Sequence, residues 1–355
     1  MLNSLHISGF RTFKDLKVNR LGKVNLIVGR NNVGKTSLLE AVHLYTSPNV
    51  LEPILCLLER RQEYAFEKDE NIVSLRSLFH QRDERLVNIK MGETDQMTWM
   101  TMSRKWRLIE GVGGERSHQT QRESDDQPEG LGSIEVLAIE YEDAGIKLSV
   151  PMYGEQLNEV RHTFKNQTMR SLFLPSNGFY DNSIEPSVLW DQVVLTDNED
   201  TVLDALRVIE PNLERIVMVQ GRRSQRLAMA KLSKRKPMPL RSLGDGMNRL
   251  FELAVGLVST GKDGTFLVDE IDSGLHFRTL SDVWRLVFSA AKRLDIQVFA
   301  TTHSWDCIEA FQKASTEHPE AGLLVRLERV DDAIYAETFS EEELAIITRQ
   351  SIEVR

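Results

Sequence analysis

The residues from Gly29 to Ser37, Gly-Arg-Asn-Asn-Val-Gly-Lys-Thr-Ser, fit the pattern G-x-x-x-x-G-K-[ST] of a phosphate-binding loop. Glycines at both ends let the backbone adopt positive φ and approach a polyphosphate, so that N–H groups at the start of a helix point at it. Lys35 supplies a mobile charge for the β and γ phosphates, and the Thr36 hydroxyl is placed to ligate Mg²⁺. The pattern therefore predicts a site for ATP and Mg²⁺.

The residues on either side of this loop supply the structure that the pattern requires. Val24–Val28 is a mostly apolar run that favours a strand, and apolar residues then recur at helical spacing from Leu38 to Tyr45. Phosphate loops of this kind lie between a strand and a helix. The alternative, a chance glycine turn before a helix, leaves this agreement unexplained.

Two acids follow a second apolar strand far along the chain, where Asp269 and Glu270 come directly after residues 264–268. A strand of this kind is central in a parallel sheet, and ligands bind at its carboxyl end beside the phosphate loop. Asp269 is then placed to ligate Mg²⁺, and Glu270 to polarise the attacking water. An acidic turn that merely caps a buried strand is the alternative, and the phosphate loop in the same chain favours catalysis.

A glycine-rich turn and a single histidine complete the set of candidate groups. Ser242, Gly244 and Gly246 belong to a turn that opens a helix and offers N–H groups to an anion, which is a weak signal by itself. The buried strand Ile296–Thr301 carries His303 just beyond its carboxyl end. A lone histidine there is often a helix cap or a core residue, so its interpretation depends on the other motifs.

The order of phosphate loop, glycine-rich turn, Asp-Glu strand and histidine strand resembles the ATP-binding-cassette (ABC) ATPases, in the branch that contains RecF, the SMC proteins and the overcoming-lysogenization-defect (OLD) ATPases. The resemblance covers residues 1–45 and 239–310, and the middle of the chain only loosely. It implies an ATPase that uses Mg²⁺. It also implies Walker A roles for six residues of the loop: Gly29, Asn32, Gly34, Lys35, Thr36 and Ser37.

The resemblance also assigns roles beyond the loop. Thr36 and Asp269 become ligands of Mg²⁺, Glu270 becomes the catalytic base, and Ser273–Gly274 becomes the D-loop. His303 takes the role of the switch histidine that senses the γ-phosphate. The implied catalytic set is Glu270, His303 and Lys35.

The turn around Gly244 departs from the family's Leu-Ser-Gly-Gly-Gln signature. Ser242 precedes a leucine, and Gly244 and Gly246 flank Asp245, which would repel a γ-phosphate unless its side chain turns away. In this family the signature of one subunit completes the site of another, so the resemblance implies a head-to-tail homodimer, or a higher homo-oligomer, that closes over ATP. A single phosphate loop leaves one side of the γ-phosphate open to water, which gives a physical reason for such a pair.

Two residues outside these motifs are weaker candidates. Arg11 lies close in sequence to the nucleotide strand, and a contact with bound nucleotide or a position on a surface hairpin fits equally well. Gln81 is a candidate for the glutamine that the family places after its phosphate-loop helix, with an exposed loop glutamine as the equal alternative.

The composition of the 355 residues, 41% hydrophobic and 27% charged, is that of an ordinary soluble globular protein. The absence of a leader, of a membrane-length apolar run and of paired cysteines favours a cytoplasmic protein without a membrane partner, a zinc site or disulfides. A net charge of −9 argues against bulk DNA binding. Residues 221–241, with eight basic and no acidic side chains, leave a solvated loop, a DNA contact or a dock for an acidic partner open.

The expected fold class is α/β, an ABC-type ATPase head with a central, mostly parallel sheet, an N-terminal antiparallel β region and an inserted mixed α+β lobe. We expect the ATPase core in residues 1–50 and 239–355. The inserted lobe is expected in residues 51–238, with a helix over 54–79 and a flexible loop at 111–133.

Two functions fit this organisation, because no long coiled coil is visible and the residues after His303 leave no room for a second catalytic domain of typical size. The first is a stand-alone ATPase of bacterial anti-phage defence, similar to the ATPase halves of PARIS, Septu or retron systems. Its ATP-dependent dimerisation would be a switch or scaffold that controls a separate, nuclease-like effector. The alternative is a RecF-like DNA-repair ATPase that clamps DNA through residues 221–241. A transporter subunit fits less well because the signature is aberrant.

Overall fold

The computed structural model describes most of the chain. The described residues are 1–48, 50–67, 70–73, 75–82, 88–94, 99–108, 123–124, 133–141, 147–151, 171–179, 185–221, 226–319 and 321–350. Within these ranges no helix combines the length and the apolar character needed to cross a membrane. The loop expected at 111–133 lies outside the described residues, apart from 123–124 and 133.

The centre of the molecule is a mostly parallel sheet. Its described strands, in spatial order, are β11 (Ser171–Leu174), β15 (Thr265–Val268), β16 (Gln297–Thr301), β3 (Val24–Val28), β17 (Gly322–Val330) and β18 (Ala333–Phe339). Neighbouring strands are parallel except for β17 and β18. β3, β11, β15 and β16 are buried along their whole length, as expected for strands covered on both faces.

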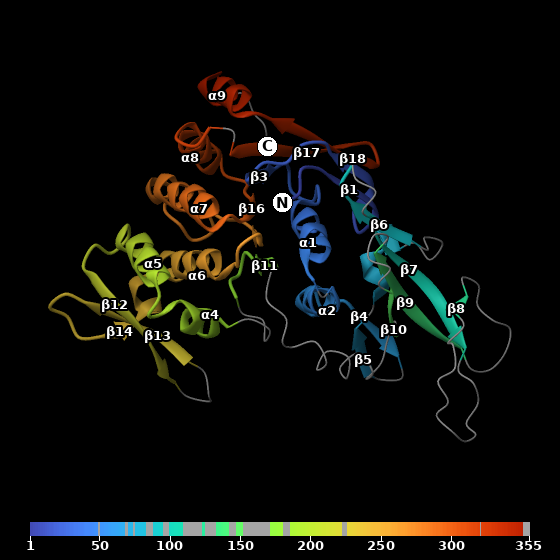
Figure 1. Cartoon of the computed structure of the whole chain (residues 1–355), viewed down its shortest axis with the longest axis horizontal. Coiled ribbons are helices and arrows are strands. Elements are labelled where there is room, and N and C mark those ends of the chain that lie inside the picture. The colour runs from blue at the N-terminus through green and yellow to red at the C-terminus, as the bar shows by residue number, and fades with distance from the viewer. Residues whose placement is uncertain are drawn as a thin grey trace.

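Helices cover both faces of this sheet (Figure 1). They are α1 (Lys35–Thr46) on one face and α6 (Asp245–Ser259), α7 (Leu280–Leu294) and α8 (Trp305–Thr316) on the other. Because successive side chains of a strand point to opposite faces, Ile27 and Phe299 belong to the core shared with α1. Leu26 and Val298 belong to the core shared with α6, α7 and α8.

An antiparallel sheet packs against the other side of α1. Its described strands are β1 (Leu5–Phe10), β2 (Phe13–Val18), β6 (Asn88–Gly92), β7 (Trp99–Leu108), β8 (Glu123–Ser124), β9 (Ser133–Tyr141) and β10 (Lys147–Pro151). Ile7, Met91 and Ile139 point from it into the core that contains Leu38 and Leu39 of α1. The N-terminal antiparallel region expected from the sequence is therefore one part of a larger sheet.

The helix predicted over 54–79 is wrong beyond its first turns. Helix α2 (Leu51–Arg60) ends at Arg60, and the left-handed Gln62, with φ 54°, follows it. β4 (Tyr64–Glu67) then pairs with β5 (Glu70–Val73). Two short 3₁₀ turns follow, η1 (Leu75–Leu78) and η2 (His80–Arg82). Aromatic and β-branched residues in 64–73 favour strands, and such short runs are not separated from helix by periodicity alone.

A second group of elements lies on the far side of the parallel sheet. It contains α4 (Pro186–Val193), α5 (Asp197–Arg207), the strands β12 (Leu213–Gln220), β13 (Arg226–Leu232) and β14 (Met238–Pro239), and η4 (Leu240–Leu243). Thr196 caps α5 by accepting a hydrogen bond from the backbone N–H of Asn198, and Trp190 of α4 packs on Phe251 of α6.

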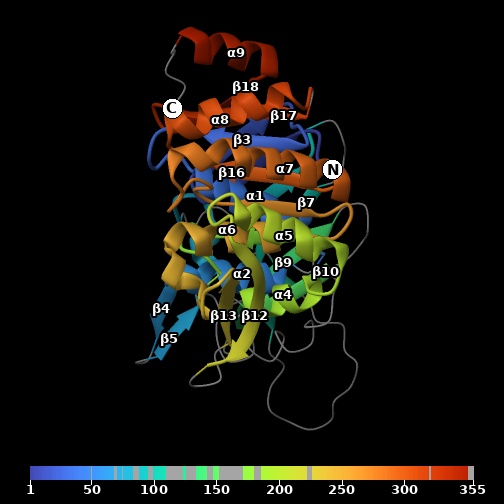
Figure 2. The same ribbon diagram turned by 90° about the vertical axis from the view of Figure 1, so that its left-hand side faces the viewer.

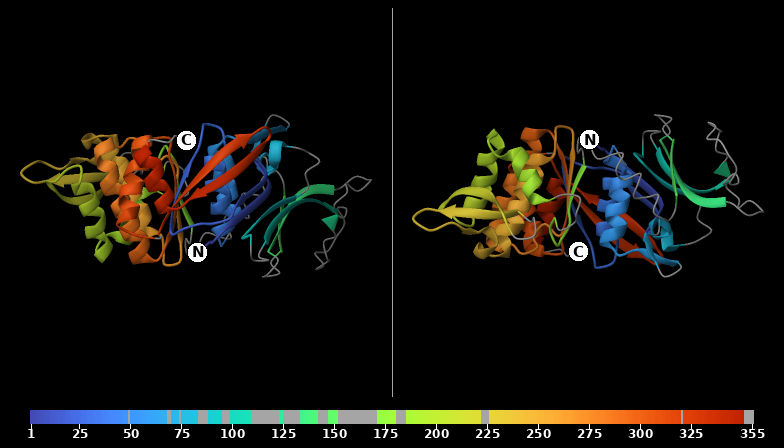
Figure 3. Two further views of the ribbon diagram at one scale, coloured as in Figure 1. Left: turned by 90° about the horizontal axis from the view of Figure 1, so that it is seen from above. Right: turned by 90° about the horizontal axis from the view of Figure 1, so that it is seen from below.

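This second group and the antiparallel sheet lie at opposite ends of the long axis of the molecule, with the parallel sheet between them (Figure 3). β11, which falls inside the expected insert of residues 51–238, is an edge strand of the core sheet. A single inserted lobe with those boundaries therefore does not describe the structure. The chain instead leaves the core twice, before and after β11.

The C-terminal elements complete the helical face of the core. The turn η5 (Phe277–Thr279) leads into α7, and α9 (Glu341–Gln350) follows β18. Figure 2 shows α9 at one end of a stack that continues through α8, α7 and α6. Leu344 and Ile347 bury the inner side of α9 in the core that α6, α7 and α8 share.

Candidate nucleotide-binding and catalytic site

The phosphate loop joins the carboxyl end of β3 to the start of α1. Gly29 and Gly34 have φ of 142° and 94°. A Cβ at Gly29 would lie 2.4 Å from the backbone oxygen of Leu327, and one at Gly34 would lie 2.5 Å from Thr12 Oγ1. Both positions thus require glycine for conformation and for space, and the loop is held between β17 and the β1–β2 turn.

Asn32 and Ser37 also have defined places in this segment. Asn32 adopts the left-handed conformation with φ 63°, which asparagine tolerates better than most residues, and its backbone oxygen accepts a hydrogen bond from Arg329 Nη2 at 3.1 Å. Ser37 is buried in the first turn of α1. The loop is therefore tied to β17 at its tip, and the nucleotide contacts of these two residues stay predictions.

Lys35 lies back across its own loop. Its Nζ donates hydrogen bonds to the backbone oxygens of Gly29 and Arg30 at 2.8 and 3.0 Å. Burial lowers the pKa of the Lys35 amine to about 8, against the opposing effect of the Asp269 and Glu270 carboxylates. The Lys35 ammonium group, which is predicted to bind the phosphates, is thus held by backbone oxygens of the phosphate loop.

Asp269 is fixed by two hydroxyl groups. Thr36 Oγ1 donates to Asp269 Oδ2 at 3.0 Å, and Thr301 Oγ1 donates to Asp269 Oδ1 at 2.6 Å. In the described part of the chain no ion pair reaches this carboxylate within 4.0 Å. A hydroxyl oxygen and an unneutralised carboxylate side by side match the hard oxygen ligands that Mg²⁺ prefers, so Thr36 and Asp269 fit the predicted metal roles.

Glu270 has the left-handed backbone conformation, with φ 47°, which is uncommon for a residue with a side chain. Thr301 Oγ1 accepts a hydrogen bond from the Glu270 N–H at 2.8 Å, so one threonine orders both acids. The Glu270 side chain is 46% exposed. Its carboxylate is therefore accessible to the water that the proposed hydrolysis requires.

His303 lies between Lys35 and Glu270. Its Nδ1 is 3.3 Å from Lys35 Nζ, and its Nε2 is 3.8 Å from Glu270 Oε1. Burial, with the nearby Lys35 charge, lowers the pKa of His303, which favours the neutral ring. An ammonium group has no lone pair, so the contact requires an acceptor at Nδ1 and a proton on Nε2, which faces Glu270.

Three adjacent strands bring this cluster together. β3, β16 and β15 are neighbours in parallel register, with Thr301 beside Ile27 and Val268 beside Ala300. Residues that are far apart in sequence therefore meet at one edge of the sheet, as expected for carboxyl ends of parallel strands. The predicted residues brought together are Lys35, Thr36, Asp269, Glu270 and His303.

The signature turn is placed differently. Gly244 has φ 106°, and a Cβ there would have no atom within 4 Å. Ser242 is exposed, whereas a Cβ at Gly246 would lie 2.7 Å from the backbone oxygen of Gly274. Among the described contacts none joins this turn to the phosphate loop of the same chain. The turn is packed on the D-loop at Gly246 and open at Gly244.

Arg11 is buried and paired with two acids. Its Nε lies 2.8 Å from Glu40 Oε2, and its Nη1 and Nη2 donate to the two carboxylate oxygens of Glu63 at 2.9 and 3.1 Å. Glu40 also pairs with Arg60 and Arg61 at 3.2 and 2.8 Å. The guanidinium is thus part of a buried ion-pair cluster, so Arg11 is not the surface hairpin residue of the alternative, and its contact with nucleotide stays a prediction.

Gln81 is exposed and lies beside the β1–β2 turn at Arg11 and Thr12, which packs against the phosphate loop. Its backbone N–H donates to the Arg11 oxygen at 3.2 Å, and its φ is 52°. The same turn supplies Thr12, which contacts Gly34. The family role of Gln81 stays a prediction.

Two residues of the site were not found from the sequence. The sequence pattern places Thr301 only in a buried strand and assigns no role to Arg249. In the structure both form hydrogen bonds to Asp269 and Glu270. The polar threonine at the carboxyl end of an apolar strand was the available signal for the first, and the sequence held none for the second.

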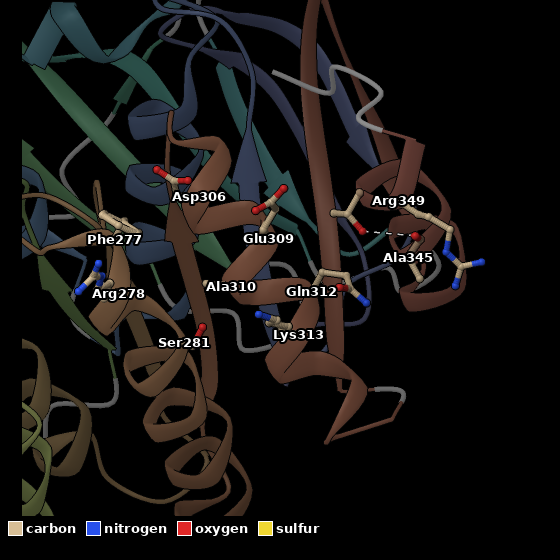
Figure 4. A pocket seen from close by; sticks show the side chains of 11 residues that line it. Phe277, Arg278, Ser281, Asp306, Glu309, Ala310, Gln312, Lys313, Ala345 and Arg349 are labelled. Carbon is tan, nitrogen blue, oxygen red and sulfur yellow. Dashed lines mark hydrogen bonds between the residues drawn. The ribbon is translucent and has the colours of Figure 1, made fainter.

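A pocket of about 570 Å³ lies next to the segment that follows the D-loop (Figure 4). Phe277 and Arg278 of η5 line one side, Asp306 and Glu309 of α8 another, and Arg349 of α9 a third. None of the residues assigned to nucleotide lines it.

The family follows from comparison with known proteins. Residues 96–306 match the family model described as "AAA domain, putative AbiEii toxin, Type IV TA system", and residues 1–126 match the one described as "AAA ATPase domain". The first match covers more than half of the chain. The chain belongs to this AAA domain family.

Relatives and solved structures agree with this family. The "ATP/GTP phosphatase" of Helicobacter pylori (strain ATCC 700392 / 26695) is 24% identical over 340 residues, 89% of each chain. The "DNA replication and repair protein RecF" of Clostridioides difficile (strain 630) is 44% identical over 43 residues, 12% of each chain. An SMC head bound to the C-winged helix domain of ScpA matches with a TM-score of 0.53 at 12% identity, covering 98% of this chain and 99% of that one. The expected α/β fold, which is that of an SMC head, and the classification as an ATPase are confirmed.

Proposed function

We propose that this AAA domain protein binds ATP with Mg²⁺, hydrolyses it, and uses ATP-dependent head-to-tail dimerisation as a switch that controls a separate effector in anti-phage defence. The observation that carries the enzymatic part is the meeting of Lys35, Thr36, Asp269, Glu270 and His303 at the carboxyl ends of β3, β15 and β16. The name of the H. pylori relative, an ATP/GTP phosphatase, supports the same activity.

Each group has a role that its geometry allows. The N–H groups at the start of α1 and the Lys35 ammonium bind the phosphates, and Thr36 and Asp269 hold Mg²⁺, which supplies charge neutralisation at the transferred phosphoryl group. Glu270 orients and polarises the attacking water from an exposed position. The Nε2–H of neutral His303 stands beside that carboxylate and donates to the γ-phosphate as the site closes.

The signature turn supports the dimer. It is open at Gly244 and makes no described contact with the phosphate loop of its own chain, while α6 begins there without a side-chain cap. Backbone N–H groups at such a helix start bind an anion, and the γ-phosphate of a second subunit has the required charge. ATP would thus lie between two chains, each supplying one half of a site.

The dimer proposal is tested with two variants in saturating ATP and Mg²⁺. Glu270→Gln keeps the binding groups and removes the carboxylate that drives hydrolysis, so it should accumulate as an ATP-bound dimer. Lys35→Ala removes the phosphate charge and should remain monomeric. Molar mass from light scattering decides the question, and a monomeric Glu270→Gln that binds ATP contradicts dimerisation.

The defence role is supported by the family description, which names a toxin of a type IV toxin–antitoxin system. The experiment is to tag Glu270→Gln, express it with its native gene neighbours, and purify it in ATP and Mg²⁺. A stoichiometric protein partner, with little nucleic acid, is the expected result. Nucleic acid without a protein partner contradicts the effector model.

A RecF-like DNA clamp is the second candidate, favoured by the 43-residue RecF match and by the basic segment 221–241. Part of that charge is used inside the molecule. Arg226 pairs with Asp191, and Lys231 Nζ donates to the backbone oxygens of Leu232 and Arg235 at 3.0 and 2.9 Å. DNA affinity that falls steeply with salt in the ATP-bound dimer is the result that selects this function.

A further inference from the structure

Arg249 connects the signature helix to the two acids of the same chain. It lies in the second turn of α6, and its side chain is buried. Nη2 donates to the backbone oxygens of Asp269 and Glu270 at 2.7 and 3.2 Å, and Nη1 donates to the Pro175 oxygen at 2.6 Å. One guanidinium thus ties α6 to the segment after β15 and to the segment after β11.

Burying the Arg249 guanidinium costs free energy, because the charge is bonded to carbonyl groups and not to a carboxylate. Burial lowers the pKa of Arg249, and the carboxylates of Glu252, Asp269, Glu270 and Asp272 oppose that effect from a distance. Its Nε has no hydrogen-bond partner among the described residues. A leucine or methionine would fill this space without these costs, so packing alone does not explain an arginine.

Glu270 is the residue that these bonds restrain. Its left-handed backbone is kept only if its surroundings hold it, and both of its peptide groups are held. The peptide between Asp269 and Glu270 is bonded to Arg249 through its oxygen and to Thr301 Oγ1 through its N–H. The peptide after Glu270 is bonded to Arg249 through its oxygen and to the Thr301 oxygen through the Ile271 N–H.

The start of α6 touches the same segment at a second point, where Gly246 packs on the Gly274 oxygen. The first two turns of α6 therefore contact the segment that carries the two acids at two points, through Arg249 at residues 269–270 and through Gly246 at Gly274. A Cβ at Gly244, by contrast, would have no atom within 4 Å. We propose that Arg249 is a positioning residue that couples the two ATP sites of a dimer. When the signature turn closes on the nucleotide of a second subunit, α6 transmits the movement through Arg249 to Glu270 of its own chain. This inference rests on the proposed dimerisation.

The test compares the ATP dependence of hydrolysis in wild type, Arg249→Met, Arg249→Lys and Thr301→Val. Wild type should hydrolyse ATP with a Hill coefficient clearly above 1 and no higher than about 2, as expected for two coupled sites. Arg249→Met should lower kcat on the order of 10- to 100-fold, with affinity for a non-hydrolysable ATP analogue changed by less than about 3-fold, and its Hill coefficient should fall to about 1. Arg249→Lys, which keeps one donor, should recover part of kcat.

Thr301→Val is the matched comparison, because Thr301 holds Glu270 from β16 and not from α6. It should lower kcat while the Hill coefficient stays at the wild-type value. Arg285→Met, which removes an exposed arginine of α7, should match wild type in both quantities. Arg249→Lys also serves if Arg249→Met does not fold, as judged by circular dichroism.

Three results overturn the coupling: a wild-type Hill coefficient of 1, Arg249 variants that keep wild-type cooperativity, or a Thr301→Val that loses cooperativity as fully as they do. Failure of the underlying function gives a different result. If Glu270→Gln binds ATP but stays monomeric, both the proposed dimerisation and the proposed coupling are wrong. If Glu270→Gln dimerises and the Arg249 variants stay cooperative, only the coupling is wrong.

Discussion

Two buried carboxylates near the phosphate loop, Glu40 and Asp269, are held in opposite ways. Glu40 on α1 is fully buried, and three guanidinium groups, from Arg11, Arg60 and Arg61, lie within 3.2 Å of its oxygens. Asp269 is 8% exposed, and its oxygens accept hydrogen bonds from two hydroxyl groups. The Glu40 carboxylate is therefore paired with arginines, whereas the Asp269 carboxylate is oriented by hydroxyl groups.

This difference distinguishes a structural acid, Glu40, from the acid that we propose binds Mg²⁺, Asp269. A carboxylate already paired with arginines gains little from a cation and loses much when its partners are left unpaired. A carboxylate held by hydroxyl groups has a fixed orientation and no arginine partner, which favours the binding of Mg²⁺. Removing the two charges should therefore affect different properties of the protein.

The largest expected effect is that of Asp269→Asn. The amide keeps the shape of the side chain but loses the charge that holds Mg²⁺, so kcat for ATP should fall on the order of 10³-fold. Steady-state phosphate release at several Mg²⁺ concentrations measures this. Thermal unfolding should change little, and a variant that keeps wild-type activity at low Mg²⁺ contradicts the metal role.

Glu40→Gln should show the reverse pattern. It leaves Arg11, Arg60 and Arg61 without their shared acid, so the free energy of unfolding should decrease by about 3–5 kcal/mol. Urea denaturation measures the loss, and kcat of the folded fraction should stay within about 3-fold of wild type. Asp282→Asn, which breaks an exposed pair with Arg285, is the control and should cost less than about 1 kcal/mol. If Glu40→Gln and Asp282→Asn lower the free energy of unfolding equally, the structural role assigned to Glu40 is wrong.

The smallest expected effect is on pH dependence through Lys35. Its pKa is lowered from 10.5 to about 8 by folding, so between these values the unfolded chain binds more protons and the stability contributed by Lys35 rises with pH. Below pH 8 both states are protonated and the full cost of burying the charge is present. The difference in unfolding free energy between wild type and Lys35→Met should therefore increase from pH 8 to 10, by at most about 1.4 kcal/mol per pH unit and less where water screens the site. A difference that is flat in pH contradicts the lowered pKa.

The core strands and the helices beside them were predictable because each carries its own signal. β3, β15 and β16 are short apolar runs that end in glycine, acid or hydroxyl residues, and α6 begins at a glycine-rich turn. The middle of the chain gave weaker signals. The helix over 54–79 was wrong after Arg60, and β11 was missed although it lies in the core sheet.

The sequence by itself was enough to predict the phosphate loop, because that pattern depends only on the types and spacing of Gly29, Gly34, Lys35 and Thr36. It also determined which strand ends in Asp269 and Glu270. Only the tertiary structure decided that Arg11 pairs with Glu40 and Glu63, and that Thr301 and Arg249 hold the two acids. Those contacts join a side chain to a carboxylate or a backbone group on another element. No local pattern encodes such a pairing, since it depends on which strands and helices become neighbours.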